Sequence, residues 1–264
     1  MRAALAIVKV TLRQLLGRRA SIGLLLLCLL PAVSQFLVGF SQSDQEALEL
    51  YRESTFGLLF GVAVPLTTVV LATGALGGER RGNTLGFILL RPISRMVVAV
   101  AKILAAWLAA FGVTAIGAGV AGTALGLTTG NWAQLLPTIA GVGVATLGYA
   151  AVFTAFGYFT DRATLAGLAY LLIWEGAVAS PIPALTTTSL WRIGVSAYAG
   201  LVSEGRHWAT GTGLVNQSQS QLRDLLGVVV PGFWGALAKS LVLTLIAGAV
   251  LSYAFRRQRV TSEV

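Results

Sequence analysis

The chain has 264 residues, of which 56% are hydrophobic and only 11% are charged. An ordinary soluble domain carries about a quarter charged residues, so this composition excludes that class and predicts an integral membrane protein. The formal net charge of +9 would suit a nucleic-acid partner if the basic residues covered one soluble face. They flank apolar segments instead, so we expect no nucleic-acid partner.

The first residues, 1–19, predict a helix that lies in the membrane interface. Arg2, Lys9 and Arg13 fall on one stripe at about 100° per residue, with leucine and valine residues alongside. A basic amphipathic helix of this kind binds along a membrane surface. A cytoplasmic extension of the first membrane span is the alternative.

Apolar segments long enough to cross a membrane follow. A helix needs about 20 residues to span the hydrocarbon core, and six segments approach or reach that length: 22–40, 56–76, 97–121, 135–159, 163–180 and 233–255. The predicted fold class is therefore all-α, a six-helix transmembrane bundle forming a single domain over 1–264. Pro31, Pro65 and Pro137 fall within these spans and predict local kinks.

The distribution of lysine and arginine predicts the orientation. Basic residues concentrate before the first span, between the second and third, and after the sixth. The first loop on the opposite side carries Asp44, Glu46, Glu49 and Glu53 against Arg52. By the positive-inside rule, both termini are expected in the cytoplasm, in a multi-pass protein of the cell (inner) membrane.

The connection between the fifth and sixth spans, 181–232, predicts an external loop with some structure of its own. It is too long for a simple connector and contains apolar and aromatic residues. We expect short helices there, lying at the outer leaflet. On the sixth span, small residues four apart, such as Ala236, Ser240 and Thr244, predict close helix packing within the subunit or between subunits.

The connection between the second and third spans, residues 79–95, predicts a short amphipathic helix on the inner membrane surface. Leu85, Ile88 and Leu89 form an apolar face at helical spacing. Asn83 or Thr84 can cap the start of this helix, and Pro92 ends it because the residue before a proline avoids helical geometry. Basic residues frame the segment: Arg80, Arg91 and Arg95.

This segment resembles the same connection in type 2 ABC transporter permeases, which reads approximately Glu-Arg-x-x-Gly-Thr-Leu, an apolar run, Pro-x-Ser-Arg and a later Lys. The matching residues here are Glu79, Arg80, Thr84, Leu85, Pro92, Ser94, Arg95 and Lys102. Two positions differ: Asn83 stands where glycine is expected, and Gly86 where an acidic residue is frequent. Asparagine tolerates positive φ, so the turn can be retained.

The resemblance implies the membrane-spanning permease subunit of an ATP-driven exporter. A cytoplasmic ATP-binding subunit would dock on the coupling residues Glu79, Arg80, Thr84, Leu85, Ile88, Leu89, Arg91, Pro92 and Arg95. The arginines would pair with acidic groups of that subunit or bind anionic lipid headgroups. A second permease copy or a paralogue would complete the transport path.

The chain itself carries no signature of an enzyme. It has no Gly-x-x-x-x-Gly-Lys-[Ser/Thr] loop to hold phosphate, so ATP and Mg are expected on the ATP-binding subunit, with no cofactor here. It has one histidine, His207, which argues against a zinc enzyme. We therefore expect no catalytic residue and no metal site. A transport path lined by glycine, alanine, threonine and aromatic residues, with few charges, favours an amphipathic or apolar cargo over a small ion.

Glu175 and Lys239 are the ionisable residues well inside predicted spans. Each would be costly alone in the hydrocarbon core. Their depths match, so we expect an ion pair in the outer half of the membrane that anchors the base of the external loop. Such groups could also relay protons in an ion-coupled secondary transporter, and a permease-like role in assembly or maturation of an extracytoplasmic machinery is a further alternative.

Overall fold

The computed structural model describes residues 2–39, 43–82, 93–178, 188–202 and 232–261. Every secondary-structure element in these ranges is a helix, in agreement with the predicted all-α class. Nine are α-helices: α1 (Arg2–Leu16), α2 (Ala20–Val38), α3 (Asp44–Ser54), α4 (Val64–Arg81), α6 (Arg95–Thr129), α7 (Leu135–Phe159), α8 (Ala163–Ala169), α9 (Leu190–Ala199) and α12 (Gly232–Thr261). Two are π-helices: η2 (Thr55–Ala63) and η3 (Tyr170–Val178).

Within the described ranges, five helices are long and apolar enough to cross a membrane: Ala20–Val38, Asp44–Arg81, Arg95–Thr129, Leu135–Phe159 and Gly232–Arg257. They correspond to five of the six predicted spans. The predicted span 163–180 contains a shorter apolar helix, Ala163–Ala177. Even in regular α-helical geometry, fifteen residues extend only about 22 Å, which is less than the hydrocarbon thickness. A multi-pass protein is thus confirmed, whereas a sixth span stays a prediction.

The acidic segment expected as a loop before the second span is helical. Ser43 and Glu46 form a capping box: the Ser43 backbone N donates to Glu46 Oε2 at 3.0 Å, and the Glu46 backbone N donates to Ser43 Oγ. This reciprocal pair satisfies free N–H groups at the start of α3. The chain then continues without interruption through η2 into α4. The loop assignment was therefore wrong, although the Ser-x-x-Glu spacing was visible in the sequence.

The change from η2 to α4 falls next to Pro65, in the first turn of α4. Proline has no N–H to donate, and its ring clashes with the preceding helical turn. A π-helical segment accommodates such an interruption. The local irregularity that the sequence predicts at Pro65 therefore takes the form of a widened turn.

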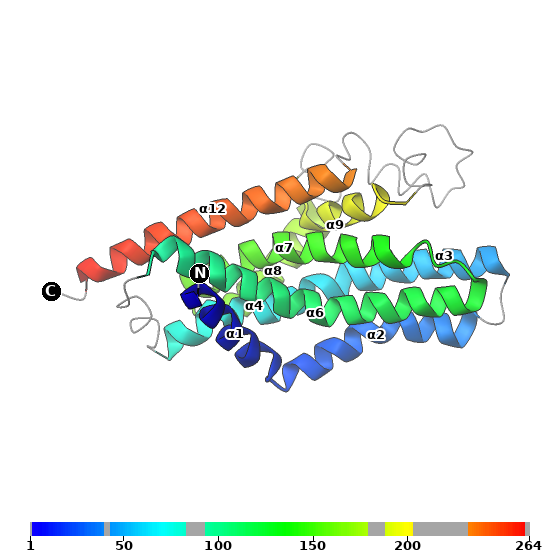
Figure 1. Ribbon diagram of the computed structural model, residues 1–264, viewed down its shortest axis with the longest axis horizontal. Coiled ribbons are helices and arrows are strands. Elements are labelled where there is room, and N and C mark those ends of the chain that lie inside the picture. The colour runs from blue at the N-terminus through cyan, green and yellow to red at the C-terminus, as the bar shows by residue number, and fades with distance from the viewer. Residues whose placement is uncertain (1, 40–42, 83–92, 179–187, 203–231, 262–264) are drawn as a thin grey trace.

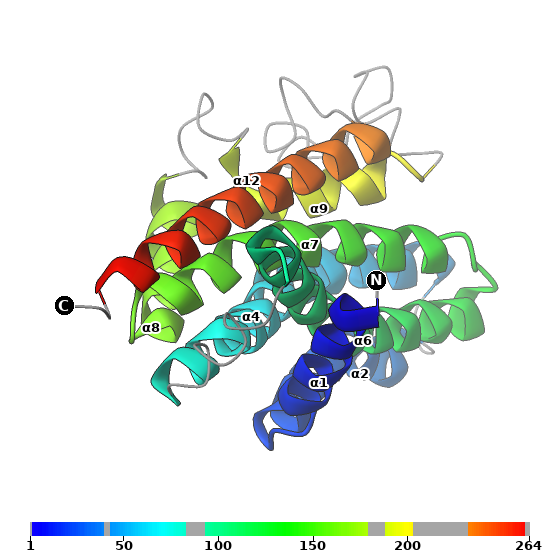
Figure 2. The ribbon, with the colours of Figure 1, turned by 60° about the vertical axis from the view of Figure 1, so that its left-hand side comes forward.

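The long helices run side by side in a bundle, with α12 on one side, α1 and α2 on the other, and α7 between them (Figures 1 and 2). Helix α7 packs against α4, α6, α9 and α12. Small residues permit close approach of the helices: a Cβ on Gly157 of α7 would lie 2.5 Å from the carbonyl oxygen of Thr73 in α4. Ser240 of α12 likewise donates to the carbonyl of Val144 in α7 at 3.0 Å, so this small residue serves packing within the subunit.

One end of the bundle, here called the basic end, gathers α1, the end of α4, the start of α6, the α7–α8 connection and the last turns of α12. An apolar cluster joins these elements there, with Ile7, Leu76, Ile103, Tyr158 and Phe255 among its members. The rings of Tyr158 and Phe255 meet edge to face with centroids 5.1 Å apart. Helix α1 is therefore packed against the bundle along at least part of its length.

Polar contacts join the helices at the opposite end. The hydroxyls of Tyr51 in α3 and Thr138 in α7 are hydrogen-bonded at 2.7 Å. Tyr198 of α9 donates to the side-chain oxygen of Gln134, just before α7. Helix α9 is the one described helix within 181–232, and most of its residues are buried. Its expected place at the outer leaflet stays a prediction.

Candidate coupling site and intramembrane polar site

A buried ion pair joins three helices at the basic end. Glu79 in the last turns of α4 pairs with Nζ of Lys102 in α6, and the same Nζ donates to Thr11 Oγ1 of α1 at 2.8 Å. The Lys102 side chain is 1% exposed and the Glu79 side chain 14%. An unpaired charge at such a position would be expensive, so the two charges require each other.

This ion pair joins the two sides of residues 83–92, the part of the predicted coupling segment that lies outside the described residues. Glu79 lies before residues 83–92 and Lys102 lies after them, so their contact ties the two flanks of the segment together and fastens both to α1. The family resemblance implies that Glu79 contacts an ATP-binding subunit, and it includes Lys102 only as a motif position. The spacing of these two residues in the chain carried no signal that they touch.

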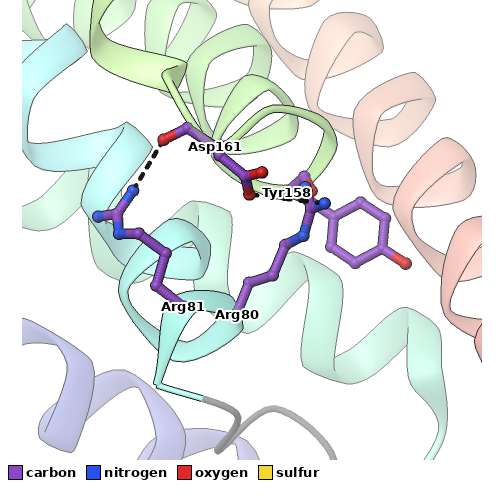
Figure 3. Close-up of polar contacts among 4 residues, drawn as sticks. All are labelled: Arg80, Arg81, Tyr158 and Asp161. Atoms are coloured by element: carbon purple, nitrogen blue, oxygen red, sulfur yellow. Dashed lines mark hydrogen bonds and ion pairs between the residues drawn. The ribbon is translucent and has the colours of Figure 1, made fainter.

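Arg80 and Arg81 hold the end of α4 to the connection between α7 and α8 (Figure 3). Arg80 Nη1 donates to the carbonyl of Tyr158, and its Nη2 lies 3.6 Å from Asp161 Oδ1. Arg81 Nη1 donates to the carbonyl of Asp161 at 3.2 Å. The Arg80 side chain is still 35% exposed. Arg80 therefore holds α4 to the α7–α8 connection within the chain, and its contact with another subunit or with lipid stays a prediction.

Most of the other predicted coupling residues lie outside the described residues: Thr84, Leu85, Ile88, Leu89, Arg91 and Pro92. Arg95 is the first residue of α6 and is partly exposed. The site that can be described is therefore the platform on both flanks of residues 83–92. It comprises Glu79, Arg80 and Arg81 on one side, and Arg95 and Lys102 on the other.

A second polar site surrounds Glu175 in η3. Its Oε2 accepts from Ser189 Oγ at 2.6 Å, and its Oε1 accepts from the backbone N of Leu190 at 2.7 Å. Ser189 is the N-cap of α9 and accepts from the backbone N of Arg192 at 3.3 Å. A negative charge at a helix N-terminus is favoured by the helix dipole. Glu175 therefore links η3 to the start of α9, across residues 179–187.

The predicted ion pair of Glu175 with Lys239 is not formed in the described part of the chain, where the ion pairs are Arg80–Asp161 and Lys102–Glu79. The prediction rested on the matching depths of the two residues and on the adjacency of the fifth and sixth spans in the sequence. The start of α9 offers Glu175 a hydroxyl and a backbone N–H directly, and this partner could not be placed without the tertiary structure. Lys239 lies in α12 and is partly exposed.

Glu175 also borders a cavity of about 520 Å³. Its walls come from η2, α4, α7, α8, η3 and α9, and they are mostly apolar. Arg192 lies at the polar part of the lining with Glu175 and Ser189. Burial lowers the pKa of Arg192 and the nearby negative charge of Glu175 opposes that shift. The two opposite charges are thus close enough to interact, without direct contact.

The fold and these sites define a multi-pass α-helical membrane protein with a structured platform at its basic end. Residues 17–183 match the family described as ABC-2 family transporter protein, and the chain belongs to this family. The matched region includes the first four of the five long apolar helices, the predicted span 163–180 and the whole segment 79–95. Membership in the family implies association with an ATP-binding subunit. No curated protein is significantly similar to the chain.

Proposed function

We propose that this chain is the permease subunit of an ATP-driven exporter and that residues 79–95 couple it to a separate cytoplasmic ATPase. The main support is the Glu79–Lys102 ion pair together with its bond to Thr11. A force applied to residues 83–92 would act on a platform already joined to α1, α4 and α6. The Arg80 and Arg81 contacts extend that platform to α7.

In this proposal the basic end faces the cytoplasm, with both termini on that side of the cell (inner) membrane. The excess of lysine and arginine at this end supports the orientation through the positive-inside rule. The basic residues of the segment would also contact anionic lipid.

The complex would contain two permease chains, either identical or paralogous, and one ATPase per permease. ATP and Mg would bind the ATPase, while this chain would carry no cofactor and perform no catalysis. The cargo would be amphipathic or apolar. Crosslinking of the active reconstituted complex should trap permease dimers, and recovery of monomers alone would refute this assembly.

The decisive experiment is purification of the chain with its ATP-binding subunit. We expect a stable complex that hydrolyses ATP and exports cargo. Leu89→Asp should release the ATPase while the permease stays in the membrane, because a charge would then occupy the apolar face that docks. Leu201→Asp, at a 45% exposed leucine directly after α9, is the matched control and should keep the complex intact.

Three results would contradict the proposal. Retention of the ATPase by the Leu89→Asp permease would reduce segment 79–95 to an interfacial helix. Transport that follows an ion gradient and ignores ATP would identify a secondary transporter. A complex that hydrolyses ATP without moving cargo, and whose loss blocks an extracytoplasmic assembly, would identify an assembly factor.

A further inference from the structure

The cavity beside Glu175 is lined by both of the π-helical segments that the structure describes. Gly61 and Val62 of η2 line one part of it, and Leu171 and Glu175 of η3 line another. Tyr149 of α7 also contributes to the lining. π-helical turns are rare, and they occur frequently at functional sites because they displace side chains from their regular helical positions. Because two π-helical segments line the same cavity, this part of the bundle is a candidate functional site.

The size and walls of the cavity fit an aliphatic chain. Its volume of about 520 Å³ falls within the range of about 300–1,000 Å³ that is typical of small-molecule sites. Pro65, Leu168 and Leu171 supply apolar walls. Val62 and Leu172, which also line it, are 40% and 74% exposed. In a membrane-embedded helix such residues face lipid, so a ligand could enter from the hydrocarbon phase.

The polar part of the lining holds one anion and one cation. Each Glu175 oxygen accepts one hydrogen bond from the start of α9, which leaves acceptor capacity that the nearby Tyr149 and Tyr170 hydroxyls or a ligand can use. The Arg192 guanidinium makes no hydrogen bond or ion pair with any residue that the structure describes. Both side chains line the cavity.

A buried hydroxyl adds a third polar group. Tyr149 is 1% exposed, and its hydroxyl has no hydrogen bond of good geometry within the described ranges, although it lies in electrostatic range of Glu175. A buried polar atom without a partner costs free energy unless a ligand or water supplies one. The Tyr149 hydroxyl is therefore a third polar group beside Glu175, available to that carboxylate or to a ligand in the cavity.

We infer that this cavity binds a zwitterionic amphiphile, with its aliphatic chain along the apolar wall, its ammonium beside Glu175 and its anionic oxygen at Arg192. A purely cationic head would be repelled by Arg192, and a purely anionic head by Glu175. Each repulsion therefore offsets part of the favourable contact that the same head group would make. A head with both charges satisfies both residues. That this ligand is the exported cargo rests on the proposed function, whereas the binding requires neither ATP nor another subunit.

Binding can be followed through the fluorescence of Trp191, which lines the cavity. The other five of the six tryptophans are replaced by phenylalanine, and the permease is held in maltoside micelles. It is titrated with dodecylphosphocholine, dodecylammonium and dodecyl phosphate, each brominated on the chain as a quencher. The zwitterion should show a Kd at least about tenfold lower than either singly charged probe. A protein that retains only Trp234, which is 78% exposed, should be quenched equally by all three.

Two substitutions locate the site. A Cβ on Gly176 meets only the Leu171 carbonyl oxygen at 3.7 Å, so Gly176→Leu fills the lining without a backbone clash and should abolish saturable quenching. Gly112→Leu has open space around its Cβ, lies on α6 away from the cavity and should leave binding unchanged. Arg192→Gln should remove the preference for the zwitterion over dodecylammonium. Arg162→Gln, an exposed cation at the α7–α8 connection, should preserve that preference.

Equal affinity for the three head groups would overturn the inference, as would saturable binding that survives Gly176→Leu. A preference for dodecylammonium in the unsubstituted cavity would reduce the site to a cation site at Glu175. If any of these results is obtained while the permease still co-purifies with an active ATPase, the inference fails and the proposed function stands. In the reconstituted complex, stimulation of ATP hydrolysis by dodecylphosphocholine would support zwitterionic amphiphiles as the exported cargo. Binding without stimulation would contradict that assignment and identify a site for a resident lipid.

Discussion

Replacing Lys102 by methionine should destabilise the protein strongly, because it removes one partner of a buried ion pair. Methionine fills a similar volume, so the packing of α1, α4 and α6 is largely kept. The Glu79 carboxylate, in a side chain that is 14% exposed, would lose its cation, and the Thr11 hydroxyl would lose a donor. Breaking a buried pair in this way costs about 3–5 kcal/mol. For a chain of this size that corresponds to a fall in unfolding midpoint of roughly 6–20 °C.

The measurement is thermal unfolding of the purified permease in micelles, followed by tryptophan fluorescence at one heating rate. Lys9→Met removes an exposed lysine of α1 and should change the midpoint little. The double substitution Glu79→Gln with Lys102→Met leaves two neutral side chains, and it should recover at least half of the loss. Losses that simply add in the double variant would show that the two residues are not energetically coupled.

Two further substitutions probe helix packing in the same assay. Gly157→Ala would place a methyl group 2.5 Å from the Thr73 carbonyl oxygen. The resulting separation of α4 from α7 should lower the free energy of unfolding by about 1–3 kcal/mol. The control Gly112→Ala, which has open space at its Cβ, should be neutral or slightly stabilising. Tyr51→Phe removes the 2.7 Å hydrogen bond to Thr138 at a buried position, and should cost about 1 kcal/mol. A Gly157→Ala protein as stable as its control would contradict the close approach of α4 and α7. An unchanged midpoint for Tyr51→Phe would show that the hydrogen bond to Thr138 does not contribute to stability.

Local composition was sufficient to predict most of the helices. The predicted span 135–159 coincides with α7, and the spans 22–40 and 233–255 differ from α2 and α12 by a few residues at their described ends. Apolar length determines such elements, because backbone groups in lipid must be paired within the helix itself. The same local logic located residues 79–95 as an unusual connection and led to the family to which the chain belongs.

The sequence-based predictions were wrong or incomplete where they rested on charge or hydropathy alone. Charged residues led to a loop assignment at Asp44–Ser54, yet the Ser43–Glu46 capping box starts a helix there. The predicted span at 163–180 is divided between α8 and η3, and no hydropathy pattern distinguishes a π-helix from an α-helix. Both cases depend on how the backbone N–H and C=O groups are paired, and hydropathy does not report that pairing.

Which polar side chains meet was decided by the tertiary structure alone. The sequence by itself determined that Glu175 is unusual, because a charge within an apolar span demands a partner, and that Glu79 and Lys102 occupy positions of the family motif. It did not determine that Lys102 pairs with Glu79 under α1, or that Glu175 binds the start of α9 in place of Lys239. The cost of burying a charge is a property of one residue and its local surroundings. The identity of the partner depends on how the helices pack, and that packing brings together residues that are distant in the chain.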